Sequence, residues 1–221
     1  YLGYADVGLS EDFFTATRPS IEMLDDQLFK YHVDFSHLSI DENTAALCVS
    51  RPTNPTGNVL DDGEMAHLDD IAQRHEIPLI IDGAYGQPFP NILFTEAQPL
   101  WNENIILALS LSKLGLPGVR TGIIVAREEI IQAYTNANTV VSLACGNLGP
   151  AIAKELFNSG EILSLTADYV TPFYRERSAL TVQWLREALA GLPFHIHKPE
   201  GAIFLWLWFE QLPISSKELY Q

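Results

Sequence analysis

Short, continuous apolar runs alternate along the chain with longer segments whose apolar residues recur at helical spacing. Four of the runs are typical of buried strands, and they cover residues 45–50, 78–81, 105–109 and 122–126. Helical spacing predicts helices over residues 64–75, 128–134, 151–157 and 168–192, with Asp61 or Asp62 capping the first. Strands that alternate with helices in this way predict an α/β layer with a mostly parallel sheet.

The two ends of the chain have a different pattern. Residues 13–17 predict a short strand that Arg18-Pro19 ends, and a loop follows through residues 30–34. Beyond Gly191, residues 194–197 alternate, and residues 202–209 predict a strongly apolar strand. We therefore expect two units: a larger domain over 1–165, and the long helix with a smaller domain over 166–221.

The charge and the cysteines restrict the partners and the compartment. The net charge is −15 and spread along the chain, which opposes binding to the phosphates of nucleic acids. No apolar run approaches the ~18 residues that a membrane span needs. Cys48 and Cys145 lie in apolar surroundings without a CxxC spacing, so we expect two reduced core thiols in a cytoplasmic protein.

Polar residues with useful chemistry follow the ends of three predicted strands. They are Asn54, Asp82 and the group from Ser110 to Lys113. In parallel sheets, ligand sites form outside the carboxyl ends of the strands. We therefore expect these side chains to converge on one site.

Lys113 lies within the stretch SLSKLGLPGVRTG, directly after a buried-strand pattern. A lysine in such a place is costly to desolvate unless it is used, and desolvation favours the neutral amine that can attack an aldehyde. Taken alone, Lys113 could equally be a surface lysine. With its neighbours it predicts a lysine that carries pyridoxal phosphate (PLP) as a Schiff base.

The other requirements of PLP also have candidates. Asp82 can hold the protonated pyridine nitrogen, and both Tyr85 and Asn54 can bond the ring hydroxyl. The alternative for Asp82 is a purely structural role, as a carboxylate that caps a turn.

The phosphate of PLP has its own candidates. Ser110, Ser112 and Arg120 suit it, because hydroxyls and a guanidinium bind phosphate oxygens. Pro117 and Gly118 would return the chain so that Arg120 reaches this site. The alternative for Arg120 is a purely structural role in a surface ion pair.

The segments SRPTNPTGNV, IDGAYG and SLSKLGLPGVRTG closely resemble those of the class I/II aminotransferases of PLP fold type I. KPEGAIFLWLWF is similar to the first small-domain strands of that family. The resemblance covers nearly the whole chain. It implies a large domain with helices on both faces of a mostly parallel sheet, and the start of a smaller α+β domain.

The resemblance also implies a function. It implies PLP-dependent transamination between an aliphatic amino acid of the valine or alanine type and a 2-oxo acid of the pyruvate type, with Lys113 as the Schiff-base lysine and acid/base. It gives Asp82, Tyr85, Asn54, Ser110, Ser112 and Arg120 the cofactor contacts described above. It places Tyr1 where the family stacks an aromatic ring on the pyridine, and it implies a homodimer.

By the same resemblance, the substrate-carboxylate arginine lies beyond Gln221 and the glycine-containing phosphate loop before Tyr1. We therefore expect a fragment that lacks both termini and is inactive by itself.

Other functions are compatible with the same residues. A PLP-dependent carbon–sulfur lyase would use the same side chains, and a ligand-sensing domain of a transcription regulator could share the fold. His195 and His197 alternate on one face, but no cysteine or acidic cluster completes a metal-ligand set, so no metal is expected. The absence of GxGxxG disfavours a nicotinamide-dependent dehydrogenase.

Overall fold

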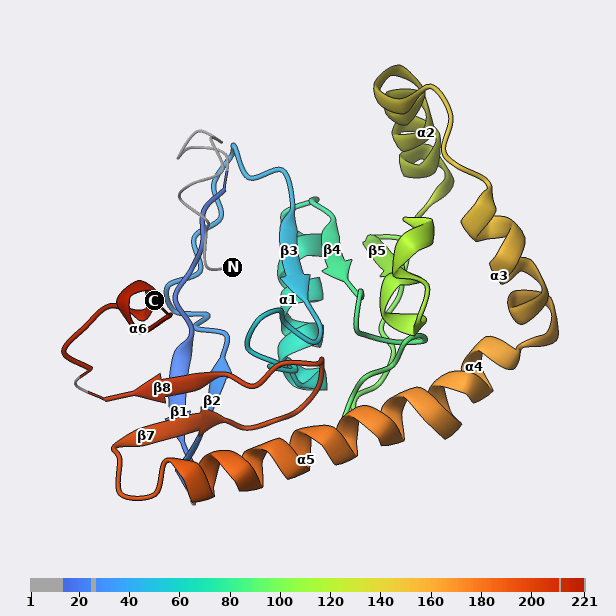
Figure 1. Ribbon diagram of the computed structural model, residues 1–221. Coiled ribbons are helices and arrows are strands. Elements are labelled where there is room, and N and C mark those ends of the chain that lie inside the picture. The colour runs from blue at the N-terminus through green and yellow to red at the C-terminus, as the bar shows by residue number, and fades with distance from the viewer. Residues whose placement is uncertain (1–13, 25–26, 211, 221) are drawn as a thin grey trace.

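The computed structural model describes residues 14–24, 27–210 and 212–220 (Figure 1). Two four-stranded sheets carry the fold, one in the order β3-β4-β5-β6 and the other in the order β1-β2-β7-β8. None of the helices in these described ranges is long and apolar enough to cross a membrane.

The first sheet contains β3 (Leu47–Ser50), β4 (Leu79–Asp82), β5 (Ile105–Ser110) and β6 (Gly122–Val125). The first three strands are parallel, and β6 is antiparallel to β5. Ser50 pairs with Asp82, and Asp82 pairs with Ala108, so the parallel strands end near one edge of the sheet. The predicted mostly parallel sheet is confirmed, with strand boundaries within two residues of the expected ones.

Helix α1 (Asp62–Arg74) covers one face of this sheet. Its start is fixed by a capping box, in which the Asp61 carboxylate accepts from the Glu64 N–H and the Glu64 carboxylate accepts from the Asp61 N–H. Its apolar side chains pack on the alternate residues of the strands that face it, and the buried cluster includes Met65, Leu68, Ala72, Leu79, Ile81 and Ile105.

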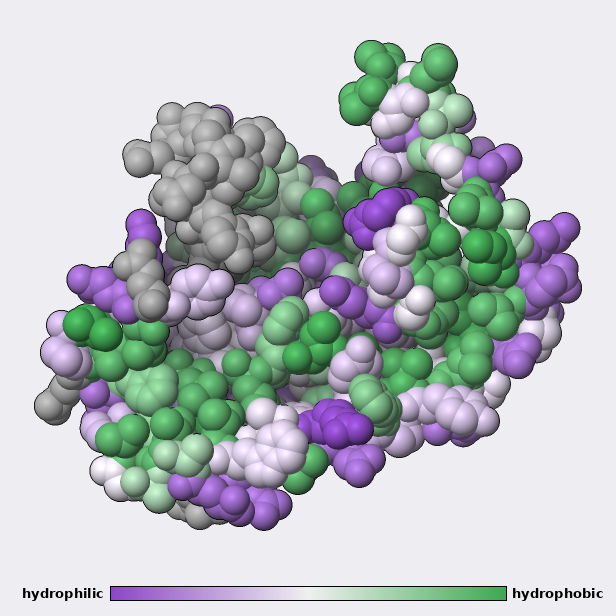
Figure 2. All heavy atoms as spheres, in the orientation of Figure 1, coloured by the Kyte–Doolittle hydropathy of each residue, from purple (hydrophilic) through white to green (hydrophobic). Residues whose placement is uncertain are grey.

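The helices that follow β6 lead away from the sheet and then back along the molecule (Figure 1). They are α2 (Glu128–Ser142), α3 (Leu148–Ser159), α4 (Glu161–Leu165), a π-helical turn (Thr166–Val170) and α5 (Thr171–Ala188). Ala153 and Ile162 are buried against Leu109 and Leu111, which ties α3 and α4 to the end of β5. Helix α2 has no buried residue, and apolar side chains gather at its outer end (Figure 2).

The second sheet joins residues from distant parts of the chain. It contains β1 (Ser20–Met23), β2 (Leu28–His32), β7 (Phe194–His197) and β8 (Leu207–Phe209), and the short helix α6 (Ser216–Tyr220) follows it. β2 runs parallel to β7, while β1 and β8 are antiparallel to their neighbours. This pairing was not foreseen, and the division into domains at residues 165 and 166 stays a prediction.

Three expectations about the ends of the chain are wrong. Residues 14–17 form no strand, and the first strand begins only after Pro19. The expected loop at 30–34 is partly strand, because β7 offers β2 a partner that its own sequence does not reveal. The apolar strand expected at 202–209 shrinks to Leu207–Phe209, because the Ala202 N–H donates instead to Ile92 O, 2.9 Å away.

The cysteines are the other correction. Cys48 and Cys145 are free, but both are exposed rather than in the core. Cys48 alternates along β3 with Leu47 and Val49, which face the α1 cluster, so its side chain points to the opposite face of the sheet.

Candidate active site

The loops that follow the parallel strands are held side by side at the carboxyl edge of the first sheet. The Arg51 N–H donates to Asp82 O at 3.0 Å, and the Gly83 N–H donates to Ala108 O at 2.8 Å. The loops approach so closely that a Cβ on Gly86 would lie 2.3 Å from Arg51 O. Only glycine fits there without movement of the backbone, so this packing fixes the relative position of the two loops.

Asp82 ends β4 and presents an exposed carboxylate. Its Oδ1 accepts from the Ala84 N–H at 3.0 Å, and its Oδ2 accepts from the Ser50 hydroxyl at 3.3 Å. No ion pair involves Asp82 within the part of the chain that the structure describes. The carboxylate is therefore oriented by neutral donors and is free to meet a cationic ligand.

Lys113 and Tyr85 lie close together in the structure. Lys113 lies in a 3₁₀ turn (Ser112–Leu114) directly after β5 and is half-buried. Its Nζ is 5.2 Å from the centroid of the Tyr85 ring, within the range of a cation–π contact. Tyr85 is 4% exposed, and its ring also contacts the ring of Phe204, at 5.6 Å between ring centroids. The lysine amine thus lies against a fixed aromatic ring.

Hydroxyls and a guanidinium meet beside this lysine. The Ser112 N–H donates to Ser110 Oγ at 3.1 Å, and Arg120 Nη1 donates to Ser112 Oγ at 3.1 Å. A second 3₁₀ turn (Pro117–Val119) and the left-handed backbone of Arg120, at φ 47°, return the chain to Ser112. The guanidinium also donates to Pro117 O and remains exposed, so it keeps donors for an incoming anion.

Asn54 lies at the tip of the loop after β3, and its side chain is exposed. Hydrogen bonds from the Thr53 N–H to Asn58 O and from the Gly57 N–H to Thr53 O, both 2.8 Å long, close this loop. Among the described residues, no hydrogen bond links the Asn54 side chain to Asp82, Tyr85 or Lys113. Tyr1 lies outside the described residues.

A group of polar residues that the sequence did not predict is buried behind the loop of Asn54. His197 is 1% exposed, and its Nε2 lies 2.9 Å from Asn58 Oδ1. Burial lowers the pKa of His197 to about 4; the nearby Glu200 carboxylate opposes this shift, and Lys30 acts in the same direction as burial. His195 is instead paired with Glu210 at 2.8 Å, so the two histidines of β7 serve separate partners. The charged Lys198-Pro199-Glu200-Gly201 turn beside an apolar run was the only local signal of this group.

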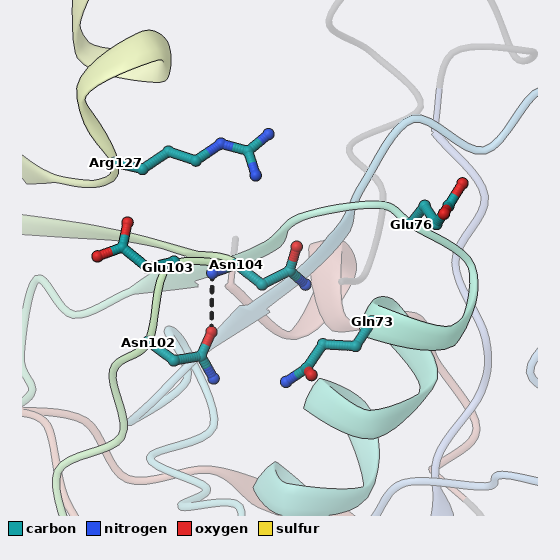
Figure 3. Close-up of a pocket in the computed structure, with 6 residues that line it drawn as sticks. All are labelled: Gln73, Glu76, Asn102, Glu103, Asn104 and Arg127. Atoms are coloured by element: carbon teal, nitrogen blue, oxygen red, sulfur yellow. Dashed lines mark hydrogen bonds between the residues drawn. The ribbon is translucent and has the colours of Figure 1, made fainter.

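A hollow of about 690 Å³ lies at the opposite edge of the sheet (Figure 3). Its lining comes from the end of α1, the segment before β5 and the start of α2, and consists of Gln73, Glu76, Asn102, Glu103, Asn104 and Arg127. The Asn104 N–H donates to Asn102 Oδ1 at 2.8 Å, so part of this polar surface binds itself. The lysine and hydroxyls of the candidate site are absent from this lining and lie at the carboxyl edge instead.

Comparison with known proteins gives consistent results. Residues 20–221 match the family described as "Aminotransferase class I and II". The valine–pyruvate aminotransferase of Escherichia coli K12 is 57% identical over the whole chain, which corresponds to 53% of that protein.

Two solved structures are similar to this chain in both sequence and fold. In the crystal structure of valine-pyruvate aminotransferase from Salmonella typhimurium LT2, the sequence identity is 55% and the TM-score 0.89, over 92% of this chain and 52% of that one. For a putative amino-acid aminotransferase from Psychrobacter arcticum, the sequence identity is 51% and the TM-score is 0.87, over 91% of this chain and 48% of that one. The chain thus spans about half the length of these relatives.

Proposed function

This chain belongs to the class I and II aminotransferases, and on that basis we propose that it carries the cofactor site of a PLP-dependent aminotransferase. The proposed substrates are an aliphatic amino acid of the valine or alanine type and a 2-oxo acid of the pyruvate type. The observation that carries the proposal is the Lys113 amine against the Tyr85 ring, at the end of the strand next to that of Asp82.

The donor set at this edge fits PLP. The Arg120 guanidinium, with Ser112 and Ser110, suits the phosphate, and the Asp82 carboxylate suits the protonated pyridine nitrogen. Lys113 would hold the cofactor covalently, with Tyr85 and Asn54 as donors to the ring hydroxyl. When bound, PLP acts as an electron sink for the bond that breaks at the amino acid Cα.

The residues of the chain then have distinct tasks. Asp82 stabilises the protonated ring nitrogen because a carboxylate at hydrogen-bond distance favours the cation. The Lys113 Nζ would act as the acid/base that takes the proton from the amino acid Cα and delivers it to the cofactor carbon. The buried Tyr85 ring restricts where that amine can lie.

The proposal includes a homodimer in the cytoplasm. Helix α2 has no buried residue, and Val140, Val141 and Leu143 are each more than 80% exposed, which favours burial against a second subunit (Figure 2). The free thiols of Cys48 and Cys145 suit a reducing compartment. Tyr1 as the residue that stacks on the pyridine ring remains part of the proposal. Nucleic acids and membranes are not among the proposed partners.

The test is a half-reaction with the complete product of the gene that carries this chain. We expect valine or alanine, added to the PLP-loaded protein without an oxo acid, to abolish the absorbance band of lysine-bound PLP, and pyruvate to restore it. The Lys113→Ala variant should lack the band from the outset. Release of ammonia and pyruvate from a cysteine conjugate would instead identify the lyase, and a band that no amino acid changes would favour a ligand sensor.

We also propose that the 221-residue chain does not catalyse transamination by itself. Val140, Val141 and Leu143, at the end of α2, are more than 80% exposed, and the described residues do not cover them, so we expect a second subunit to do so. Turnover by the purified chain, together with a sharp unfolding transition, would contradict this.

A further inference from the structure

The connector between β7 and β8, residues 198–206, packs beneath both loops that bear the proposed donors to the cofactor ring. A Cβ on Gly57, in the loop of Asn54, would lie 2.8 Å from Gly201 O. A Cβ on Gly201 would lie 2.7 Å from Ile92 O, and the Ile92 N–H donates to Tyr85 O at 2.9 Å. Gly201 of the connector therefore packs at the same time against Gly57, in the loop of Asn54, and against Ile92, which bonds to Tyr85.

A buried ion pair holds this contact together. Lys30 of β2 is 8% exposed and Glu200 of the connector is 3% exposed. The Lys30 Nζ donates to Glu200 Oε2 and, at 2.9 Å, to Val59 O. Glu200 Oε2 also accepts from the Val59 N–H at 3.1 Å, while Lys198 Nζ lies 3.4 Å from Oε1. Both backbone groups of Val59 are thus held by the two buried charges.

Hydrogen bonds continue from this pair toward Asn54. Next to Val59, the Asn58 side chain meets His197, and Asn58 O accepts from the Thr53 N–H at 2.8 Å. Thr53 precedes Asn54 directly. The C-terminal part of the loop, at Asn58 and Val59, is therefore tied to the second sheet and its connector, and Thr53 is tied to Asn58, while the Asn54 side chain stays exposed.

Stability alone is a weak reason for such a pair. Apolar residues of similar volume often stabilise a protein as much as a buried ion pair does, because both charges must be desolvated. What apolar residues cannot do is bind the N–H and the C=O of Val59 and so fix the loop in one arrangement.

We propose that Lys30 and Glu200 are positioning residues, which clamp the loop over 51–60 to the second sheet and so place the Asn54 amide at the cofactor ring. This role rests on the proposed function, since it assigns Asn54 to the ring hydroxyl. Neither residue contacts Lys113, Asp82 or Arg120 through a hydrogen bond or ion pair in the part of the chain that the structure describes. They act through the loop.

The test compares Glu200→Gln with Asn54→Ala in the complete gene product. Without PLP, we expect Glu200→Gln to speed hydrogen exchange of the Thr53 and Val59 amides by about tenfold or more, because the clamp holds their loop closed. With PLP, it should shift the pKa of the lysine-bound chromophore in the same direction as Asn54→Ala. In the double variant, the shift should not exceed that of Asn54→Ala alone, since both changes remove one contact.

Two further variants separate positioning from folding. Met65→Ala, in the α1 cluster, should lower the melting temperature while leaving the loop amides and the chromophore pKa unchanged. If Glu200→Gln does not fold, Lys30→Met combined with Glu200→Leu removes both charges and should still show fast exchange at Val59. Unchanged exchange, or chromophore shifts that add fully, would overturn the clamp. If the unmodified protein never acquires the PLP band, the proposed function is refuted. The hydrogen-exchange measurement without PLP would still test whether Lys30 and Glu200 hold the loop.

Discussion

The carboxyl edge of the first sheet and the junction between the two sheets use a lysine and a carboxylate in opposite ways. At the edge, Asp82 is exposed and Lys113 is half-buried, and each keeps capacity for a ligand. At the junction, Lys30 and Glu200 are less than one-tenth exposed and bind each other and the backbone of Val59. The difference agrees with the proposed roles, because a reactive group must be able to change partners and a positioning group must not.

The largest expected effect is a loss of activity at the carboxyl edge without a loss of its structure. Asp82→Asn retains an oxygen for the Ala84 N–H but removes the negative charge, so transamination should fall by about 10²- to 10³-fold with little change in melting temperature. The matched control is Asp70→Asn, which removes an exposed carboxylate paired with Arg74 on α1 and should leave the rate unchanged. Equal rates for the two variants would remove Asp82 from the chemistry.

A second change forces the loops of the edge apart. Gly86→Ala places a methyl group 2.3 Å from Arg51 O, so the free energy of unfolding should fall by roughly 3 kcal/mol. Gly118→Ala is the control, because its Cβ would meet no atom within 4 Å. Urea unfolding of both variants measures the difference, and a similar loss in the two would contradict the close approach of the loops.

The junction should lose stability in acid through His197. His197 has a pKa of about 4 in the folded state against 6.5 for the free side chain, so between these values the unfolded chain binds more protons. Stability should therefore fall as the pH drops from 6.5 to 4, by about 3 kcal/mol at most from this group.

In His197→Gln, which retains a donor for Asn58, this part of the slope should vanish from urea unfolding across the same pH range. Glu200 and Lys30 face His197 in both proteins, so their contribution is common to the comparison. An unchanged slope would show that His197 is not buried in its neutral form.

The smallest effect tests the phosphate contact. Arg120→Lys keeps the charge but loses the planar pair of donors, so the affinity for PLP should weaken about tenfold, measured by titration of the apoprotein. Arg127→Lys, at the hollow on the other edge of the sheet, is the matched control and should bind PLP unchanged. Equal affinities would place the phosphate away from Arg120.

The sequence determined the first sheet because its signals are local. The apolar runs predicted β3 to β6 to within two residues, and of the two caps expected for α1, Asp61 and Asp62, the structure uses Asp61. Since parallel strands end at one edge, the direction of the strands was enough to predict that Asp82 and Lys113 follow neighbouring strand ends. The order of three short motifs then sufficed to indicate the family.

Only the tertiary structure decided the second sheet and the junction. β2 pairs with β7, and Lys30 binds Glu200 across a separation of 170 residues, while neither segment carries a local mark of its partner. For the same reason the exposure of Cys48 was missed, because an apolar run does not show which of its faces lacks a covering helix. Residues at the carboxyl edge are thus readable from the sequence, since strand direction alone places them, whereas those at the junction depend on which distant strands meet.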